Sequence, residues 1–480
     1  MNSYQLLLGL CVFVPIIGSV LLLLVGPVHE GARNVLAFVS VLCSFVCAAF
    51  MLPLVTAPTQ NTATLTMMGV DILHADRLAV FMALVSTGVG SIIVFYSWGY
   101  IAKYRHRDEY YFMVVLFLGA MMGLVFSRNL LFLYLFWEIT AIACWRLIGF
   151  FRDKDYVLRA DKAFLVTVFG ALVMLVGFIA IGAEYGTFDL GKLSGRPISN
   201  LAVALLLTGI FAKSATLPLH TWLPDAGVAP SPVTALLHAA VLVKIGVYVF
   251  ARLLIATFTV DPIWHEIVPW IAGTSALVSA CAALVETDIK RLIAFSTISQ
   301  IGFIFLGLSV NTEMAVGGGL LYILMHGVAK GGLFLCAGIV EHGTHCKDIR
   351  KLGGLIKTMP VTAVSFALCA FSVMGIPPFG GFFSKYLVIT GTLASGQLAV
   401  GFTFVFGAVL TILYLFRVFT MVFLGEPGEA VKGHHAREGS YEMVISVASL
   451  AVLALVSGLF VSAPSELAHM TATQIVRVVP

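Results

Sequence analysis

The sequence predicts an all-α polytopic membrane protein with about fourteen transmembrane helices, two of them broken. Three observations predict this class. Of the 480 residues, 60% are hydrophobic and only 11% charged, with a mean hydropathy of +1.02, well outside the range of soluble globular domains. Apolar runs of about 17–25 residues, long enough to span a bilayer, recur along the whole chain. Two of these runs are interrupted by proline and glycine.

The predicted helices follow the apolar runs in chain order. They cover residues 5–26, 35–55, 78–101, 111–126, 130–149, 163–182, 201–217, 232–257, 263–285, 292–310, 314–340, 361–395, 398–424 and 443–462. The first run lacks a basic flank and a small-residue cleavage site, so we expect a retained helix rather than a signal peptide. Every connection is shorter than about 25 residues, which leaves no room for a soluble nucleotide-binding or redox domain.

Two predicted helices are broken, one ending at Leu217 and one interrupted at Pro377–Pro378. Each carries a lysine close to its break, Lys213 and Lys385, and about 170 residues separate the two. This spacing is what two structural repeats would give, and paired breaks of this kind point to a transporter's site at the repeat interface. Lys213 precedes its break, whereas Lys385 follows its own, and the sequence offers no reason for the asymmetry.

The charges of the loops orient the predicted bundle. With the N-terminus outside, the inner loops carry about sixteen Lys and Arg and the outer loops about six. We therefore expect both termini on the outer side of a prokaryotic cytoplasmic membrane. The net charge of +4 is not gathered into a basic cluster away from the membrane segments, so no nucleic-acid partner is expected. The eight cysteines include no CxxC and lie mostly in apolar runs, so we expect buried hydrophobes and neither a metal nor a cofactor.

Ionisable side chains occur inside several of the apolar segments. They are Glu138, Lys213, His238, Lys244, His326, Lys330 and Lys385. A charged side chain at mid-bilayer costs on the order of 3 kcal/mol on insertion scales, so each is a functional-site hypothesis by default. Lys213 is the natural partner of Glu138, because a nearby carboxylate favours the charged lysine and its movement would switch that charge. A fixed ion pair that selects the register of the bundle is the alternative interpretation.

The histidines add groups that titrate near neutral pH between the lysines, as a proton relay requires. His326 and Lys330 are four residues apart, hence one turn apart on one helix face. Lys244 follows His238 by six residues, about 100° from it around the helix but within reach of one internal channel. For each histidine, hydrogen bonding between helices is an equally reasonable interpretation.

Two further residues are weaker candidates. His220 lies in a proline-rich stretch after the first break, where freed backbone groups need protein or a water-filled cavity to satisfy them. Lys290 lies at a predicted cytoplasmic helix start, where the retention of positive loops explains it without an ion-transfer role.

Several segments taken together resemble the antiporter-like proton-channel family. They are residues 111–151 with FWEIT at 136–140, 213–253, 286–302 (ETDIKRLIAFSTISQIG), 326–338, 347–354 (KDIRKLGG) and 375–385. The family comprises the large membrane subunits of respiratory complex I, of Mrp-type sodium/proton antiporters and of membrane-bound energy-converting hydrogenases. The combination of HAAVLVKIGVY with KDIRKLGG is most similar to the N-terminal part of the large Mrp subunit and its hydrogenase relatives. The extra C-terminal helices of that subunit have no counterpart in the chain, which leaves open the assembly that it joins.

The resemblance implies fourteen helices that hold two inverted five-helix repeats. In this sequence they divide into N-terminal helices (1–110), a first repeat with broken helix seven (111–257), a second repeat with broken helix twelve (258–397) and C-terminal helices (398–480). It also implies functional residues on helices five, seven, eight, eleven and twelve. They match Glu138, Lys213, Lys244, the pair His326 and Lys330, and Lys385.

Residues and resemblance together suggest an ion-translocating subunit that moves protons, with sodium as an open alternative, in a lipid bilayer. Glu138 would modulate the charge of Lys213, the residues Lys244, His238, His326 and Lys330 would relay the proton, and Lys385 would face the exit. Because the chain has no redox or nucleotide motif, we expect other integral membrane subunits of a redox-driven pump or an Mrp-type antiporter to supply the driving force. Whether the chain serves an oxidoreductase stays open.

Two alternatives remain at the level of sequence. The chain could be a membrane scaffold that only anchors redox or antiporter partners, in which case the buried polar residues would tolerate apolar replacement. The second is quinone or substrate binding in a cavity near His220 and Trp222.

Overall fold

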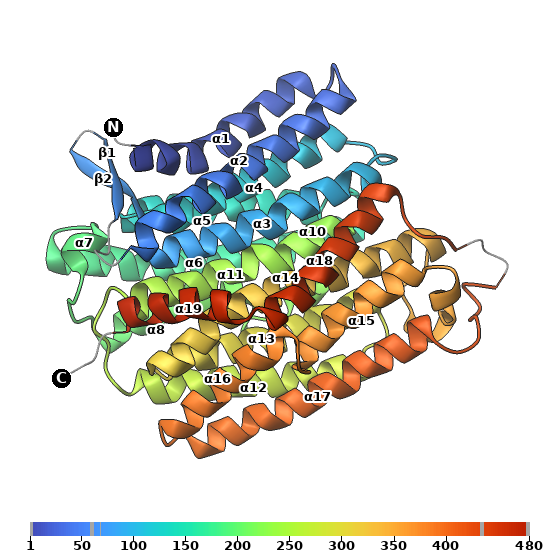
Figure 1. The fold of residues 1–480 in the computed structure, drawn as a ribbon. Coiled ribbons are helices and arrows are strands. Elements are labelled where there is room, and N and C mark those ends of the chain that lie inside the picture. The colour runs from blue at the N-terminus through green and yellow to red at the C-terminus, as the bar shows by residue number, and fades with distance from the viewer. Residues whose placement is uncertain (1–2, 58–61, 68, 433–435, 477–480) are drawn as a thin grey trace.

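The computed structural model describes residues 3–57, 62–67, 69–432 and 436–476, which form one elongated bundle of helices (Figure 1). Within this described part, twelve helical segments are long and apolar enough to cross a membrane. They are α1 (Ser3–Val25), α2 (Glu30–Thr56), α3 (Arg77–Tyr100), α4 (Arg107–Phe126), α5 (Leu130–Ile148), α6 (Lys154–Tyr185), the composite segment Ser231–Ile255, α12 (Trp264–Val285), α13 (Ile289–Ser309), α14 (Glu313–Thr344), α17 (Leu398–Phe423) and α18 (Tyr441–Leu459). The prediction of a polytopic helical membrane protein is confirmed.

Both helix breaks lie where proline and glycine predict them. Helix α8 (Asn200–Ser214) ends at Ala215, which is left-handed with φ 53°, and α15 (Pro360–Met374) ends at Gly375 with φ 82°. The Thr216 N–H donates to Phe211 O at 2.9 Å, and the Ile376 N–H donates to Phe371 O at 3.0 Å. Left-handed residues with such hydrogen bonds are a common way to satisfy the last carbonyls of a helix. After the second break, α16 (Gly380–Ala394) begins.

The structure corrects one predicted helix. Residues 232–257 were expected to form a continuous helix, but the segment consists of α10 (Ser231–Ala235), a π-helical turn (Leu236–Ala240), α11 (Leu242–Phe250) and a second π-helical turn (Ala251–Ile255). Val241, with φ −127° and ψ −72°, leaves the helical conformation between the first two parts. Neither proline nor glycine marks this site in the sequence. Wide π turns inside helices are often found at functional sites.

A short antiparallel hairpin and a last helix lie outside the predicted segments. Strands β1 (Ala63–Met67) and β2 (Val70–Ala75) pair across a turn that contains Gly69, whose φ is 78°. The strands are too short for the apolar-run criterion, although glycine supplies the positive φ that a tight hairpin turn needs. Helix α19 (Ser462–Ile475) follows α18. The short helices α7 (Leu190–Leu193) and α9 (Trp222–Asp225) lie in connections.

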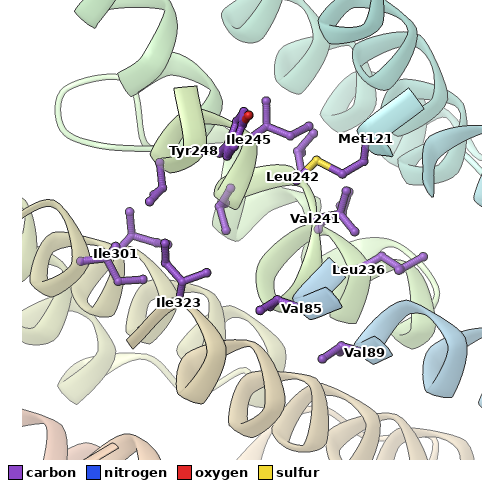
Figure 2. Close-up of a cluster of buried hydrophobic side chains, with 14 of the residues drawn as sticks. Val85, Val89, Met121, Leu236, Val241, Leu242, Ile245, Tyr248, Ile301 and Ile323 are labelled. Carbon is purple, nitrogen blue, oxygen red and sulfur yellow. The ribbon is translucent and has the colours of Figure 1, made fainter. Parts of the chain in front are cut away.

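The centre of the bundle is formed by three segments. In their apolar windows, the composite segment is 100% buried and α13 and α14 are 94% buried, against 39% for α1 and α2. In Figure 1, α1 and α2 lie at one side of the bundle and α17 at the other. Figure 2 shows the apolar cluster around the composite segment, which joins Val85 and Val89 of α3 and Met121 of α4 to Ile301 of α13 and Ile323 of α14. This dry packing surrounds the helix that carries Lys244.

The two ends of the bundle differ in charge. At one end, here called the hairpin end, lie β1, β2, α7, the start of α1 and the end of α19 (Figure 1). At the other, here called the basic end, lie the connections 101–107, 149–154, 286–290 and 345–357. These connections hold many of the loop lysines and arginines counted in the sequence.

Candidate functional site

Lys213 is fully buried in the last turn of α8, with 0% of its surface exposed. Its Nζ donates to the backbone oxygen of Trp137 on α5 at 3.2 Å and lies 5.2 Å from the centroid of the Trp137 indole. A carbonyl and an aromatic face both favour the ammonium form, but neither fixes it as a carboxylate would. The indole N–H of Trp222 donates to Ala212 O at 3.0 Å and so anchors the end of the same helix.

Glu138 adjoins Trp137 on α5, and its charge acts on Lys213. The described part of the chain holds no direct ion pair between the two residues, and Glu138 Oε1 is buried there without a hydrogen-bond partner. The structure therefore places the predicted partners within electrostatic range of each other without a direct ion pair, and Glu138 interacts with the Tyr134 side chain on its own helix.

Lys244 and His326 are directly hydrogen-bonded at the centre of the bundle. Lys244 Nζ on α11 lies 2.5 Å from His326 Nδ1 on α14, and both side chains are 0% exposed. The Lys244 amine also donates to the backbone oxygen of His238 at 3.4 Å. An amine and an imidazole at this distance can share one proton, which either can release.

His238 lies in the first π-helical turn and is fully buried. Its ring packs against Phe334 of α14 at 4.4 Å between centroids. Neither ring nitrogen has a hydrogen-bond partner among the described residues. Buried polar atoms are nearly always bonded to protein or ordered water, so two unpartnered nitrogens indicate a site suited to water.

Lys330 begins a network of hydroxyl and amide groups that the sequence analysis missed. Lys330 Nζ donates to Ser296 Oγ at 2.5 Å, and Ser296 Oγ lies 2.7 Å from the Tyr414 hydroxyl. Gln300 Nε2 donates to Tyr414 at 3.3 Å, and the Tyr322 hydroxyl donates to Gln300 Oε1 at 2.6 Å. All are fully buried polar side chains from α13, α14 and α17. A buried glutamine in an apolar run was the available signal.

Lys385 lies at the far end of this network. Its Nζ is 5.7 Å from the centroid of the Tyr322 ring and 4.6 Å from that of Phe303. The amine donates to the backbone oxygen of Val373 at 2.7 Å, back across the break between α15 and α16. The structure thus places Lys244, His326, Lys330 and Lys385 in one row of buried polar groups, in which His326 and Lys330 lie one turn apart on α14. Lys213 and Glu138 lie on the other side of the composite segment.

Lys290, which the sequence places at a predicted cytoplasmic helix start, is buried. Its side chain is 1% exposed, its Nζ lies 2.8 Å from Glu341 Oε2, and it donates to Ala229 O at 2.9 Å. Nearby, a polar pocket of about 450 Å³ opens at the basic end. It is lined by Asp155, Tyr156, Arg159, Pro224, Gly227, Val228, Asp288, Arg291 and Lys347.

A second polar pocket, of about 320 Å³, lies at the hairpin end, with Asp76 and Arg252 in its lining. Arg252 donates to both oxygens of Asp76, at 2.5 and 2.7 Å, and to the Tyr248 hydroxyl at 2.9 Å. Burial raises the pKa of the Asp76 carboxyl, but the Arg252 guanidinium more than offsets this and holds that pKa well below its usual range. Because arginine does not release its proton, the positive charge of this ion pair is fixed.

His220 lies apart from the polar row. It is half-buried in the turn after α8, and its Nδ1 is 3.3 Å from Pro218 O. Trp222 beside it is fully buried with its indole N–H already bonded. Within the described residues, no group of three or more His, Cys, Asp or Glu side chains is placed to hold a metal ion.

The chain matches two family models. Residues 127–411 match one described as NADH:quinone oxidoreductase/Mrp antiporter, TM, and residues 72–111 match one described as NADH-Ubiquinone oxidoreductase (complex I), chain 5 N-terminus. The Na(+)/H(+) antiporter subunit A1 of Staphylococcus haemolyticus (strain JCSC1435) is 34% identical over 419 residues, which cover 81% of this chain and 52% of that protein. The chain thus spans about half the length of the curated relatives that it matches.

Solved structures share the fold along nearly the whole chain. A chain of the Mrp complex from Dietzia sp. DQ12-45-1b superposes with a TM-score of 0.90 at 24% identity, covering 99% of this chain and 98% of that one. A chain of the membrane-bound sulfane sulfur reductase, an archaeal respiratory membrane complex, gives 0.87 at 23% identity over 98% of both chains.

Proposed function

The chain belongs to the NADH:quinone oxidoreductase/Mrp antiporter membrane family, and from this premise we propose that it is an ion-translocating subunit of a multi-subunit membrane complex. The translocated ion is the proton, with sodium as the coupled cation where the assembly is an antiporter of the kind named for its relatives. The partners are other integral membrane subunits, in keeping with the complexes whose chains share the fold.

The observation that carries this proposal is the row of buried polar groups at the centre of the bundle. Lys244 contacts His326 at 2.5 Å, and Lys330, one turn from His326 on α14, is joined through Ser296, Tyr414 and Gln300 to Tyr322, whose ring centroid is 5.7 Å from the Lys385 amine. Burying several amines in apolar helices is costly, and membrane-embedded ionisable residues mark ion pathways. Apolar side chains surround the segment that carries Lys244 (Figure 2), so polar groups able to carry a proton are few there.

Each residue has a distinct role in the proposal. Glu138 on α5 modulates the charge of Lys213 on α8, whose amine contacts Trp137 next to Glu138. Lys244, His238, His326 and Lys330 relay the proton, and Lys385 hands it toward the exit. Lys290 and His220 lie outside this row.

The finer architecture belongs to the same proposal. Fourteen membrane crossings result if the interrupted segments α8 and α15–α16 each count as one crossing in addition to the twelve long ones. Residues 111–257 and 258–397 would form two inverted repeats, which the matching hydrogen bonds at Thr216 and Ile376 support. Residues 1–110 and 398–480 would flank them. The basic end faces the cytoplasm, with both termini outside a prokaryotic cytoplasmic membrane.

The proposal is tested by replacing Lys213 and Glu138, which lie across the composite segment from the polar row. In proteoliposomes that contain the complete assembly, Lys213→Ala and Glu138→Ala should each lower ion-coupled proton transport by about tenfold or more. The readout is a trapped pH-sensitive dye, with the amount of assembled complex measured in parallel. Undiminished proton transport in both variants would contradict the proposal and favour a scaffold that merely anchors its partners.

A further inference from the structure

A carboxylate at the basic end lies between solvent and the buried lysine of α13. Glu341 is in the last two turns of α14, and its Oε2 pairs with Lys290, whose side chain is 1% exposed. Lys290 Nζ also donates to Ala229 O, directly before α10. A buried ion pair of this kind contributes little net stability, because desolvation offsets the Coulombic gain. Its inward position therefore points to a role beyond holding the fold.

The same carboxylate contacts a lysine that lines the pocket at the basic end. Its Oε1 lies 3.3 Å from Lys347 Nζ, and Lys347 lines the 450 Å³ pocket together with Asp288 and Arg291. Backbone hydrogen bonds hold the two segments in register, since the Ile289 N–H donates to Lys347 O at 3.0 Å. One carboxylate oxygen thus faces the pocket lining, and the other faces the buried amine.

On its inner side the pair contacts the start of α10. The Ser231 hydroxyl lies 3.3 Å from Glu341 Oε2 at the start of α10, the helix that leads into the π-helical turn of His238. His238 lies seven residues after Ser231 in this segment. Its ring nitrogens have no hydrogen-bond partner among the described residues, and an imidazole nitrogen of this kind can accept a proton.

We propose that Glu341 and Lys290 form a proton-loading site that connects the pocket at the basic end to His238 and the Lys244–His326 pair. A proton from pocket water binds the Glu341 carboxylate and removes the charge that holds Lys290 as an ammonium. Lys290 then gives its own proton, through bridging water, to a ring nitrogen of His238. The Glu341 proton passes to the amine, so that the carboxylate and the ammonium re-form. Only O–H and N–H bonds form and break, and the sequence runs equally in reverse. This inference rests on the proposed function and adds the site at which protons enter from the basic end.

The decisive variant is Lys290→Arg. Arginine keeps the positive charge and can still pair with Glu341, but it does not release its proton at any physiological pH. A purely structural pair would tolerate this change, whereas a relay would not. In proteoliposomes of the complete assembly, with a potassium diffusion potential as the driving force, Lys290→Arg and Glu341→Gln should each lower proton flux by about tenfold or more.

Two further variants complete the test. Glu341→Asp retains a titrating carboxylate and should recover most of the flux that Glu341→Gln loses. Glu286→Gln is the matched control, because it removes a carboxylate at the same end that pairs with Arg291 at 3.1 Å and contacts neither Lys290 nor Lys347. Its flux should stay at the unmodified level. If Glu341→Gln fails to assemble, the comparison of Lys290→Arg with Glu286→Gln still decides.

The possible outcomes separate this inference from the proposed function. Full proton flux in assembled Lys290→Arg would overturn the loading site while leaving the proposed function intact, provided that Lys213→Ala loses flux. Full flux in Lys213→Ala and Glu138→Ala as well would overturn both.

Discussion

Three lysine amines of the site are hydrogen-bonded to neutral acceptors rather than to carboxylates. Lys213 donates to Trp137 O, Lys330 to Ser296 Oγ and Lys385 to Val373 O. A carbonyl or hydroxyl can solvate the ammonium form, yet it does not lock that form in place as an adjacent buried carboxylate would. These lysines are therefore able to change charge when a neighbouring charge changes, which is the property that ion transfer requires.

Aromatic rings add to this balance at two of the lysines. The amine of Lys385 lies over Phe303 at 4.6 Å, and that of Lys213 lies over Trp137 at 5.2 Å. A desolvated cation–π contact is worth about 2 kcal/mol. The contact therefore stabilises the ammonium form of each lysine but offsets only part of the free-energy cost of desolvating it.

Gln300 is the residue on which the hydroxyl network depends. Replacing it with leucine leaves the buried Tyr322 hydroxyl without its acceptor at 2.6 Å and removes a donor to Tyr414. An unsatisfied buried polar group costs about 1–3 kcal/mol. We expect Gln300→Leu to destabilise the protein by that amount, measured by thermal unfolding of the detergent-solubilised assembly.

The double variant supplies the control for this prediction. Adding Tyr322→Phe to Gln300→Leu removes the stranded hydroxyl, so part of the lost stability should return. Strictly additive losses from the two changes would show that the hydrogen bond is energetically unimportant.

At the scale of the helix, the breaks explain an asymmetry between the two repeats. Lys213 lies before its break and Lys385 after its own, but the Lys385 amine reaches back to Val373 in the last turn of α15. The C-terminal end of a helix carries unsatisfied carbonyls and a partial negative charge that favour a cation. Each lysine is therefore associated with the last turn of the helix that precedes its break. Lys213 belongs to that turn of α8, and the Lys385 amine is hydrogen-bonded to that turn of α15.

Helix α18 packs directly against the second break, and this contact depends on a glycine. A Cβ at Gly458 would lie well inside van der Waals contact with Pro378 O, Gly380 N and Phe379 C, all backbone atoms. Overpacking of this kind costs about 1–3 kcal/mol or more. We expect Gly458→Ala to displace the start of α16 and, with it, Lys385, which lowers both thermal stability and proton flux.

Gly9 on α1 provides the comparison for that prediction. A Cβ there would meet no atom within 4 Å, and alanine favours a helix by about 1 kcal/mol relative to glycine. Gly9→Ala should therefore leave flux unchanged and stability equal or slightly higher. Equal behaviour of Gly9→Ala and Gly458→Ala would refute the packing argument.

Across the whole molecule, the polar row runs through the centre of the bundle between two polar pockets at opposite ends. The pocket at the hairpin end is lined by His74 and by the Asp76–Arg252 pair, whereas the pocket at the basic end is lined by Lys347, which pairs with Glu341. The described structure thus places ionisable side chains at both ends of the bundle.

The orientation of the bundle is testable with single cysteines at its two ends. Asp153 at the basic end and Lys192 at the hairpin end are both exposed. On a background in which the exposed Cys281 is replaced by alanine, a cysteine at 192 should react with a membrane-impermeant maleimide in intact cells. A cysteine at 153 should react only after permeabilisation, because the positive-inside rule retains its loop in the cytoplasm.

The reverse labelling pattern would invert the proposed orientation. It would also place the pocket beside Glu341 on the outer side of the membrane. Proton flux in the variants of Lys290 would be unaffected by that inversion, so the two tests are independent.

By itself, the sequence determined the class of the protein, the positions of nearly all its long helices, both proline-marked breaks and the set of buried ionisable residues. These follow from local properties, since the length of an apolar run, a proline and a lysine in an apolar helix are visible within a few residues. Only the tertiary structure decided which groups meet. Lys244 and His326 are 82 residues apart, and Ser296 and Tyr414 are 118 apart. Their contacts, the burial of Lys290 against Glu341 and the π-helical turn at His238 depend on packing between distant helices, which no local pattern encodes.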